Sequence, residues 1–390
     1  MKGKKIITII LGILILLVFI NNLNAQNINQ SYTKEEIKLN HERAILAGKI
    51  DSYYKELDYP NYFGGIYITS DSKYVVIQVV KNNISNLNKD KINKLNEFLS
   101  MSEVKMENVK YSYKQLEDTN ELLIKHISSN SKLINDVSAF YIDVKNNRIG
   151  IDVLTNKSHN VEKSIKEKFE EIQLFTITEV SKKVNKYVDI FKAGSGYRVF
   201  SSTPTNDYDC SVGFRARLGN DYGFVTAGHC FSQLNGNTLT SGVGTVKSNK
   251  LSNGIDAAFV KTSSSYDVSN NIYAPGGKTT KLNLTLACPW LGTGAIVAKS
   301  GRATGYSEGQ VTYPTFSTTD NGVVMLHLVG TNANAYFGDS GAPVYMPTTS
   351  SSGALLAGVL RGGAVGTNYS MIFTKEEQIY VAIGYTRYWS

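Results

Sequence analysis

The chain has 390 residues, with 41 Lys and Arg against 33 Asp and Glu, and a formal net charge of +8. With 42% hydrophobic and 19% charged residues, it is neither a disordered chain nor a polytopic membrane protein. No stripe of basic residues is present, so nucleic acid is not expected as a partner. Three cysteines are too few for the disulfide framework of a small disulfide-stabilised protein.

The first 25 residues are typical of a secretion signal. Three lysines precede an apolar run from Ile6 to Ile20 that contains no charged residue, and a polar stretch then ends at the small residue Ala25. As a helix the run would be about 22 Å long, short of the roughly 30 Å hydrocarbon core. We therefore expect cleavage and secretion, with no membrane contact afterwards. Leu23, at position −3 of the cut, keeps an uncleaved anchor as the alternative.

Charge and glycine divide the remaining chain near residue 193. Residues 26–192 hold 48 charged side chains in 167 positions, whereas residues 193–390 hold 23 in 198. Of the 33 glycines, 27 lie at or after Gly194. These differences predict a domain at 26–192 and a second domain at 193–390.

Residues 26–192 have an α+β pattern in which a helix/hairpin unit is repeated. The apolar spacing predicts helices at 33–57, 88–100 and 161–173, and hairpins at 66–80 and 140–154. Tyr67 and Tyr141 hold equivalent positions in the two units. Nothing in this section predicts catalysis, and His41, His126 and His159 are expected at the surface.

Residues 193–390 have an all-β pattern. Short apolar runs alternate with glycine and polar turns, as in sandwiches and barrels. Strands are expected at 223–226, 257–261, 295–299, 310–313, 323–329, 342–345, 355–360 and 370–373. A helix is expected at the end of the chain, where Thr374 and Glu377 have the spacing of a capping box.

Three motifs lie on this β pattern: TAGHC at 226–230, GIDAAFV at 254–260 and GDSGAPV at 338–344. They supply a histidine, an aspartate and a serine, namely His229, Asp256 and Ser340. A serine hydroxyl needs an imidazole to take its proton, and the imidazole needs a carboxylate to fix its tautomer. The glycines beside Ser340 let the N–H groups of Gly338 and Ser340 point at a developing oxyanion.

Each motif has an ordinary explanation when it is considered alone. A histidine beside glycine is common in loops, GDSG occurs by chance in turn-rich chains, and an aspartate before a strand is often a turn cap. Their combination in one all-β section, behind a secretion signal, favours nucleophilic catalysis. His327 lies within an apolar run, where a structural role is expected.

The motifs resemble those of the trypsin/chymotrypsin-like serine proteases, and in particular the secreted bacterial streptogrisins and alpha-lytic protease. The resemblance covers most of 194–390 and is also carried by the segments 299–306, 331–332 and 362–363. It implies two six-stranded antiparallel β-barrels with the triad between them. It further implies a pro-region that guides folding, inhibits the enzyme and is then removed.

The resemblance also assigns roles to single residues. It implies a disulfide between Cys210 and Cys230, which leaves Cys288 over. We expect Cys288 to be a buried, inert thiol, with a reactive thiol or pairing with another molecule as the alternatives. Asp339 would be a structural anion paired with Lys299, with Arg302 as the alternative partner. The substrate pocket would be formed by Asn334, Ala335, Arg361, Gly362 and Gly363. Asn334 departs from the family, which usually has a cysteine there.

The sequence therefore predicts a secreted serine endopeptidase made as a zymogen and cut near residues 192–196. We expect a monomer that acts on polypeptides, binds its own pro-region before cleavage and uses no metal or organic cofactor. Apolar substrate side chains are favoured, although Arg361 could attract acidic ones. The alternative is a catalytically silent protease fold that serves as an adhesin or binding module.

Overall fold

The structure, a computed structural model, describes most of the chain after residue 30. The described residues are 31–84, 89–181, 183–186, 196–199, 208–231, 239–240, 244–252, 254–263, 268–269, 271–273, 279–283, 288–320, 323–349, 353–364 and 367–387. The expected signal at 1–25 and nearly all of the expected cut at 192–196 lie outside them. Within the described ranges, no helix is both long and apolar enough to cross a bilayer.

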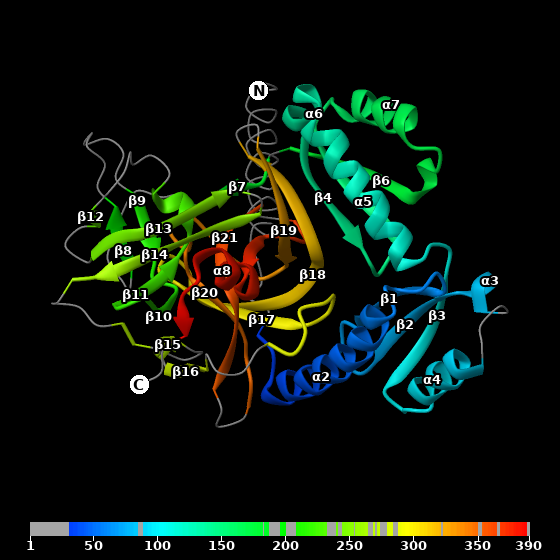
Figure 1. The fold of residues 1–390 in the computed structure, drawn as a ribbon, viewed down its shortest axis with the longest axis horizontal. Coiled ribbons are helices and arrows are strands. Elements are labelled where there is room, and N and C mark those ends of the chain that lie inside the picture. The colour runs from blue at the N-terminus through cyan, green and yellow to red at the C-terminus, as the bar shows by residue number, and fades with distance from the viewer. Residues whose placement is uncertain are drawn as a thin grey trace, which may run out of the picture.

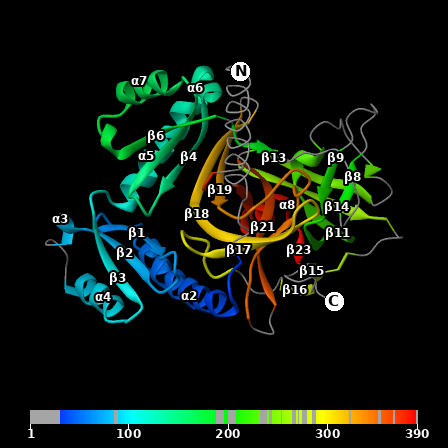
Figure 2. The same ribbon diagram turned by 180° about the vertical axis from the view of Figure 1, so that it is seen from behind.

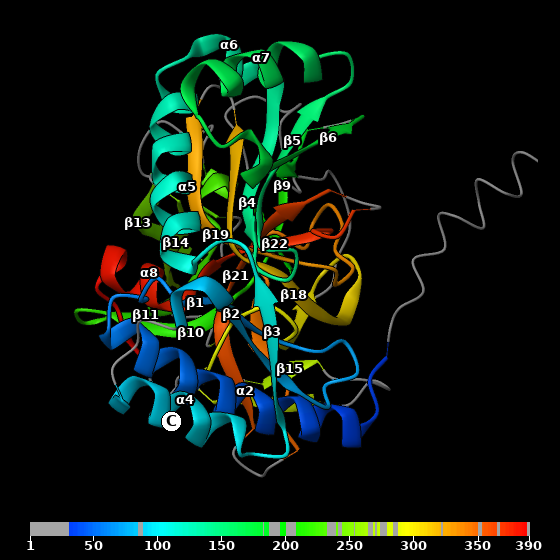
Figure 3. The ribbon, with the colours of Figure 1, turned by 90° about the vertical axis from the view of Figure 1, so that its right-hand side faces the viewer.

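Residues 31–180 contain the same order of elements twice. The first unit comprises α2 (Lys34–Glu56), β1 (Phe63–Ile68), β2 (Val75–Val80), α3 (Lys81–Ile84), α4 (Lys89–Leu99) and β3 (Val104–Val109). The second comprises α5 (Tyr113–Ser128), α6 (Ser131–Asp136), β4 (Val137–Asp143), β5 (Arg148–Leu154), α7 (Ser158–Lys168), η1 (Ile172–Leu174) and β6 (Phe175–Val180). In both units the first two strands are antiparallel and the third runs parallel to the second. Figure 3 shows the two units one above the other.

Local sequence accounts for how α2 begins and which face it buries. Thr33 and Glu36 form a capping box, in which each side chain accepts a hydrogen bond from the other residue's backbone N–H. Ala44, Ala47 and Tyr54 then recur at helical spacing and are fully buried against β1 and β2. By contrast, β3 buries a single residue, Val104, so its sequence lacks the alternation that would predict a strand.

The second half of the chain is mostly β-structure, as the sequence predicts. One eight-stranded sheet contains β8 (Gly196–Val199), β9 (Tyr208–Ser211), β10 (Phe214–Leu218), β11 (Asp221–Thr226), β12 (Leu239–Thr240), β13 (Gly244–Ser252), β14 (Ile255–Thr262) and β23 (Thr386–Arg387). The other sheet contains β15 (Asn271–Tyr273), β16 (Thr279–Asn283), β17 (Ile296–Gly301), β18 (Gly305–Asp320), β19 (Val323–Thr331), β20 (Pro343–Met346), β21 (Ala354–Gly363) and β22 (Met371–Lys375). Figures 1 and 2 show both sheets on the side of the molecule opposite α4.

Six strands of the second sheet pair in a closed antiparallel ring. The order around the ring is β17, β18, β19, β22, β21 and β20, and β20 pairs again with β17. The eight-stranded sheet has β23 and β9 at its two ends, and no pairing between described residues joins these ends. The sequence predicts two closed barrels. Among the described residues, the structure has one closed ring and one sheet whose two end strands do not pair with each other.

The two halves of the chain are joined through strand β18. Residues 316–318, near the end of β18, pair with β4, so that Phe316 lies opposite Tyr141 in one continuous sheet. The Tyr141 ring stacks on Tyr313 with centroids 3.8 Å apart. Gly150, opposite Tyr141 on β5, leaves room for this ring, because a Cβ there would lie 2.2 Å from it.

A shared apolar core reinforces this joint. Buried residues of α2, β1 and β2 belong to the same cluster as Val297, Leu360 and Phe373 of the ring. The first half therefore covers apolar surface that the ring would otherwise expose to water.

The final helix begins later than the sequence predicts. Helix α8 (Glu376–Ile383) has Lys375 as its N-cap residue, and no side chain caps it. Thr374 instead pairs with Val359 as part of β22, so its backbone is that of a strand residue and not that of a helix cap. The prediction of a capping box between Thr374 and Glu377 is wrong.

We predict that Tyr141→Ala weakens the joint between the two halves. The side chain is 8% exposed and makes stacked contacts, and removing a buried aromatic ring typically costs about 3–5 kcal/mol. Urea unfolding of the uncleaved chain measures the loss. Tyr222→Ala is the matched control, because Tyr222 is 47% exposed. Equal unfolding midpoints for the two variants would contradict the prediction.

Candidate active site

The register between β11 and β14 brings His229 next to Asp256. The strands are antiparallel, with Thr226 at the end of β11 opposite Ala258. If this register is continued by two residues, Gly228 lies opposite Asp256. His229 follows on the short helix η2 (Gly228–Phe231). The TAGHC and GIDAAFV motifs thus meet because their strands are neighbours in one sheet.

Ser340 lies on a turn between β19 and β20 that forms hydrogen bonds to strands of both sheets. Its carbonyl accepts a hydrogen bond from the Ser211 N–H at 2.7 Å, and the next N–H, of Gly341, donates to Leu360 of β21. Gly341 has φ +88°, and a Cβ there would lie 2.1 Å from Thr226 Oγ1. Only glycine fits this turn, which holds the Ser340 hydroxyl toward β11.

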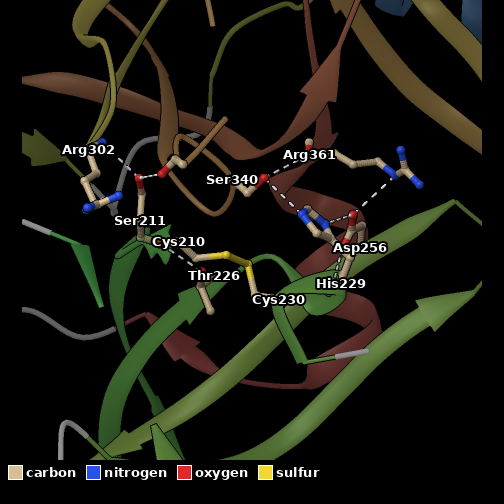
Figure 4. The surroundings of a disulfide bond; sticks show 10 residues. Cys210, Ser211, Thr226, His229, Cys230, Asp256, Arg302, Ser340 and Arg361 are labelled. Carbon is tan, nitrogen blue, oxygen red and sulfur yellow. Dashed lines mark hydrogen bonds and ion pairs between the residues drawn. A yellow bond between two sulfur atoms is a disulfide. The ribbon is translucent and has the colours of Figure 1, made fainter. Parts of the chain in front are cut away.

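The three predicted triad side chains form a hydrogen-bonded chain (Figure 4). His229 Nε2 lies 2.9 Å from Ser340 Oγ, and His229 Nδ1 lies 2.7 Å from Asp256 Oδ2. The His229 backbone N–H also donates to Asp256 Oδ1 at 2.8 Å. His229 is 3% exposed and the other two residues are fully buried. The imidazole is thus placed between an alcohol and an oriented carboxylate.

Asp256 is held in its charged form. Burial raises its pKa, but the charge of His229, its two hydrogen bonds to Asp256 and the charge of Arg361 outweigh burial and hold the pKa at about 2. A carboxylate that stays ionised at neutral pH can stabilise an imidazolium beside it.

The backbone around Gly338 is fixed before any ligand binds. Gly338 has φ +93°, a conformation that favours glycine, and its carbonyl accepts a hydrogen bond from Ser211 Oγ at 2.9 Å. The sequence did not single out Ser211. It lies beside Cys210 on β9, and no motif marks it.

Asp339 pairs with Lys299, the first of its two predicted partners. Lys299 Nζ lies 2.9 Å from Asp339 Oδ2, and both side chains are fully buried. The N–H groups of Ala303 and Thr304 donate to Asp339 Oδ1. Burial lowers the pKa of Lys299, and Asp339 opposes that change. The alternative partner, Arg302, instead pairs with Asp209 at 2.9 Å.

The implied disulfide between Cys210 and Cys230 is confirmed. It joins β9 to η2, so Ser211 and His229 are each next to one of its cysteines (Figure 4). Cys288 is half-buried, and burial raises its thiol pKa to about 12, which favours the protonated thiol at neutral pH.

The predicted substrate residues fall into two groups. Gly362 and Gly363 present a strand edge, and this edge is covered by β7 (Asn185–Lys186), which pairs with it antiparallel. Asn334 is half-buried and its carbonyl accepts a hydrogen bond from Ser307, while Ala335 is fully buried.

Arg361 differs from its predicted place on the substrate wall. Its side chain is 1% exposed and extends to Asp256, with Nε 3.2 Å from Asp256 Oδ2 (Figure 4). A guanidinium buried to this extent beside a carboxylate is not presented at the surface to an acidic substrate group. The signal that could have indicated this is an arginine directly after the apolar run 355–360, because a buried arginine needs an anion.

No family model matches this chain. Among solved structures, Thermobifida fusca Protease A aligns with 26% identity and a TM-score of 0.40, covering 50% of this chain and 96% of that one. The chymotrypsin of Cellulomonas bogoriensis aligns with 27% identity and a TM-score of 0.39, covering 46% and 91%. An alpha-lytic protease homolog, N4, aligns with 20% identity and a TM-score of 0.38, covering 50% and 97%.

The chain is similar to bacterial serine proteases. TM-scores below 0.5 leave its function to be argued from the geometry of the site itself.

We predict that Lys299→Met unfolds the site by leaving Asp339 buried and unpaired. Breaking a buried pair from one side typically costs about 3–5 kcal/mol. Urea unfolding compares this variant with Lys261→Met, which removes a lysine of the same length from the exposed pair with Asp221. An exposed pair contributes about 1 kcal/mol or less. Similar losses in the two variants would contradict the prediction.

Proposed function

We propose that residues 193–390 form a secreted serine endopeptidase. The observation that carries the proposal is the position of His229, within hydrogen-bonding distance of Ser340 Oγ on one side and of Asp256 on the other. Ser340 is the nucleophile, His229 the general base and Asp256 the group that orients it.

In the proposed reaction, Ser340 Oγ attacks the peptide carbonyl and His229 Nε2 takes its proton. Asp256 stabilises the imidazolium, and the N–H groups of Gly338 and Ser340 receive the oxyanion. The intermediate collapses to an acyl-enzyme as the amine leaves with the proton from His229. Water, deprotonated by the same imidazole, then releases the acid and restores Ser340.

Residues 26–192 are the proposed pro-region, preceded by a signal at 1–25 and removed by a cut near 192–196. One contact supports an inhibitory pro-region: strand β7 pairs with Gly362 and Gly363, the edge on which an extended substrate would pair. A second contact, between β4 and β18, attaches the proposed pro-region to the ring. We further propose that β8–β14 complete the second of two barrels, with the triad between them.

Polypeptides with an apolar side chain before the cut are the proposed substrates. Neither 331–337 nor 360–363 contains an acidic residue that could bind a lysine or arginine. Arg361 is enclosed against Asp256, which argues against its binding acidic side chains. The mature enzyme is proposed to act as a monomer and without a cofactor.

We predict that Ser340→Ala abolishes both processing and proteolysis. Removing the nucleophile of a triad typically lowers kcat roughly 10⁶-fold, so the variant should keep residues 26–192 and leave casein intact. A fluorophosphonate probe should label the wild type and the control Ser252→Ala, whose serine is exposed at the end of β13, but not Ser340→Ala. If Ser340→Ala were processed and digested casein like the wild type, the proposal would fail. Absence of labelling in the wild type would instead favour the adhesin or binding module.

We also predict that residues 194–390 refolded alone remain inactive. The ring shares its apolar core with α2 and β1, so the fragment would expose that surface while it folds. Adding residues 26–192 in trans should restore activity, measured with a chromogenic peptide after the added chain is digested. Full activity of the fragment without this addition would refute the folding role.

A further inference from the structure

A buried arginine, Arg361, adjoins the proposed triad at two points: its backbone carbonyl accepts a hydrogen bond from Ser340 Oγ at 3.3 Å, and its guanidinium lies beside Asp256 (Figure 4). Arg361 lies near the end of β21 and is 1% exposed. A buried guanidinium is tolerated only with anionic partners, because it loses its hydration. It therefore matters which carboxylates it contacts.

Arg361 connects Asp256 to a second carboxylate, Asp320. Arg361 Nε forms an ion pair with Asp256 Oδ2 at 3.2 Å, and Nη2 donates a hydrogen bond to Asp320 Oδ2 at 2.8 Å. Asp320 is the last residue of β18, and its side chain is 20% exposed. Asp256 Oδ2 is thus contacted by the imidazole from one direction and by the guanidinium from another (Figure 4).

Opposite charges alternate along the groups beside the proposed triad. Asp256 faces His229 and Arg361, while Asp320 faces Arg361 and, from the segment before β7, Lys183. With a neutral imidazole, the set of His229, Asp256, Arg361 and Asp320 has one net negative charge, which Lys183 offsets from beside Asp320. Forming the imidazolium makes the first set neutral.

We propose that Arg361 is a positioning residue of the triad, anchored by Asp320, that fixes the Asp256 carboxylate toward His229 Nδ1. The inference rests on the proposed function for its role in catalysis. Without Arg361, the described part of the chain leaves Asp256 Oδ2 held by His229 Nδ1 alone, and the carboxylate keeps only this contact and the hydrogen bond from the His229 N–H to Oδ1.

Kinetics on the secreted enzyme test this role. Arg361→Gln should lower kcat by roughly ten- to a hundredfold, the range typical of outer partners of catalytic groups, with KM changed less than about threefold. Arg361→Lys keeps the charge and should recover much of the loss. The matched control is Arg387→Gln, which removes an arginine from the distant pair with Glu376 and should leave kcat unchanged. All rates are normalised to folded protein, measured by near-ultraviolet circular dichroism.

The pH profile separates positioning by charge from simple packing. Removing the cation favours proton binding at the imidazole, so Arg361→Gln should move the acid limb of kcat/KM upward by about one to two pH units. Removing the anion has the opposite sign, so Asp320→Asn should move the limb downward. Arg361→Lys should leave the limb in place. Asp320→Asn keeps the test decisive if Arg361→Gln fails to fold, because Asp320 is partly exposed.

Proton binding by the His229 imidazole can also be followed in a variant that does not catalyse the reaction. In the full-length Ser340→Ala chain, the downfield resonance of the His229 Nδ1 proton should shift its titration midpoint in the same two directions when Arg361→Gln or Asp320→Asn is added. Midpoints that stay at the Ser340→Ala value, or that move the same way in both variants, would overturn the inference. An inactive wild type would refute the proposed function, while this titration would still decide the role of Arg361.

Discussion

The carboxylate of Asp256 is buried without access to water, and the arrangement around it depends on keeping it charged. Its partners come from separate parts of the fold: a backbone N–H and an imidazole from η2, and a guanidinium from β21. An isolated carboxylate at such a depth would be protonated or would destabilise the fold by several kcal/mol. The eight-stranded sheet and the ring must therefore pack together correctly for the ion to exist, and the same packing carries Ser340 to the imidazole.

In the proposed zymogen, the chemistry is already assembled while the first half of the chain is attached. Asp339 has a buried partner in Lys299, so its charge is already neutralised in the uncleaved chain. The hydrogen bonds among His229, Asp256 and Ser340 are also present. The strand edge at Gly362 and Gly363 is covered by β7. Inhibition in this arrangement is a matter of access to the substrate edge, because the geometry of the catalytic groups is not distorted.

The joint at β18 gives a physical reason for a folding role of the first half. The ring β17–β22 closes through pairings between distant segments, and such non-local contacts form slowly because loop closure costs entropy before contacts form. Strand β4 covers an edge of β18 that would otherwise present unpaired N–H and C=O groups. The same β18 ends at Asp320, so the strand that receives the first half also anchors Arg361 beside Asp256.

The amino-acid sequence by itself determined the local features: the two sections, the helix/hairpin repeat, most strands, and the three motifs with His229, Asp256 and Ser340. These follow from short-range periodicity and turn chemistry, which depend on residues near one another in the chain. The capping-box spacing at Thr374 gave a wrong prediction, because pairing with β21 keeps the backbone of Thr374 extended. Strand β3 was not predicted, because its mostly exposed residues lack the alternation of a half-buried strand. Only the tertiary structure decided that Lys299 and not Arg302 pairs with Asp339, and that the side chain of Arg361 lies against Asp256 and Asp320. Such choices depend on which strands become neighbours, because a buried charge is paired by whichever opposite charge the packing brings within a few ångströms.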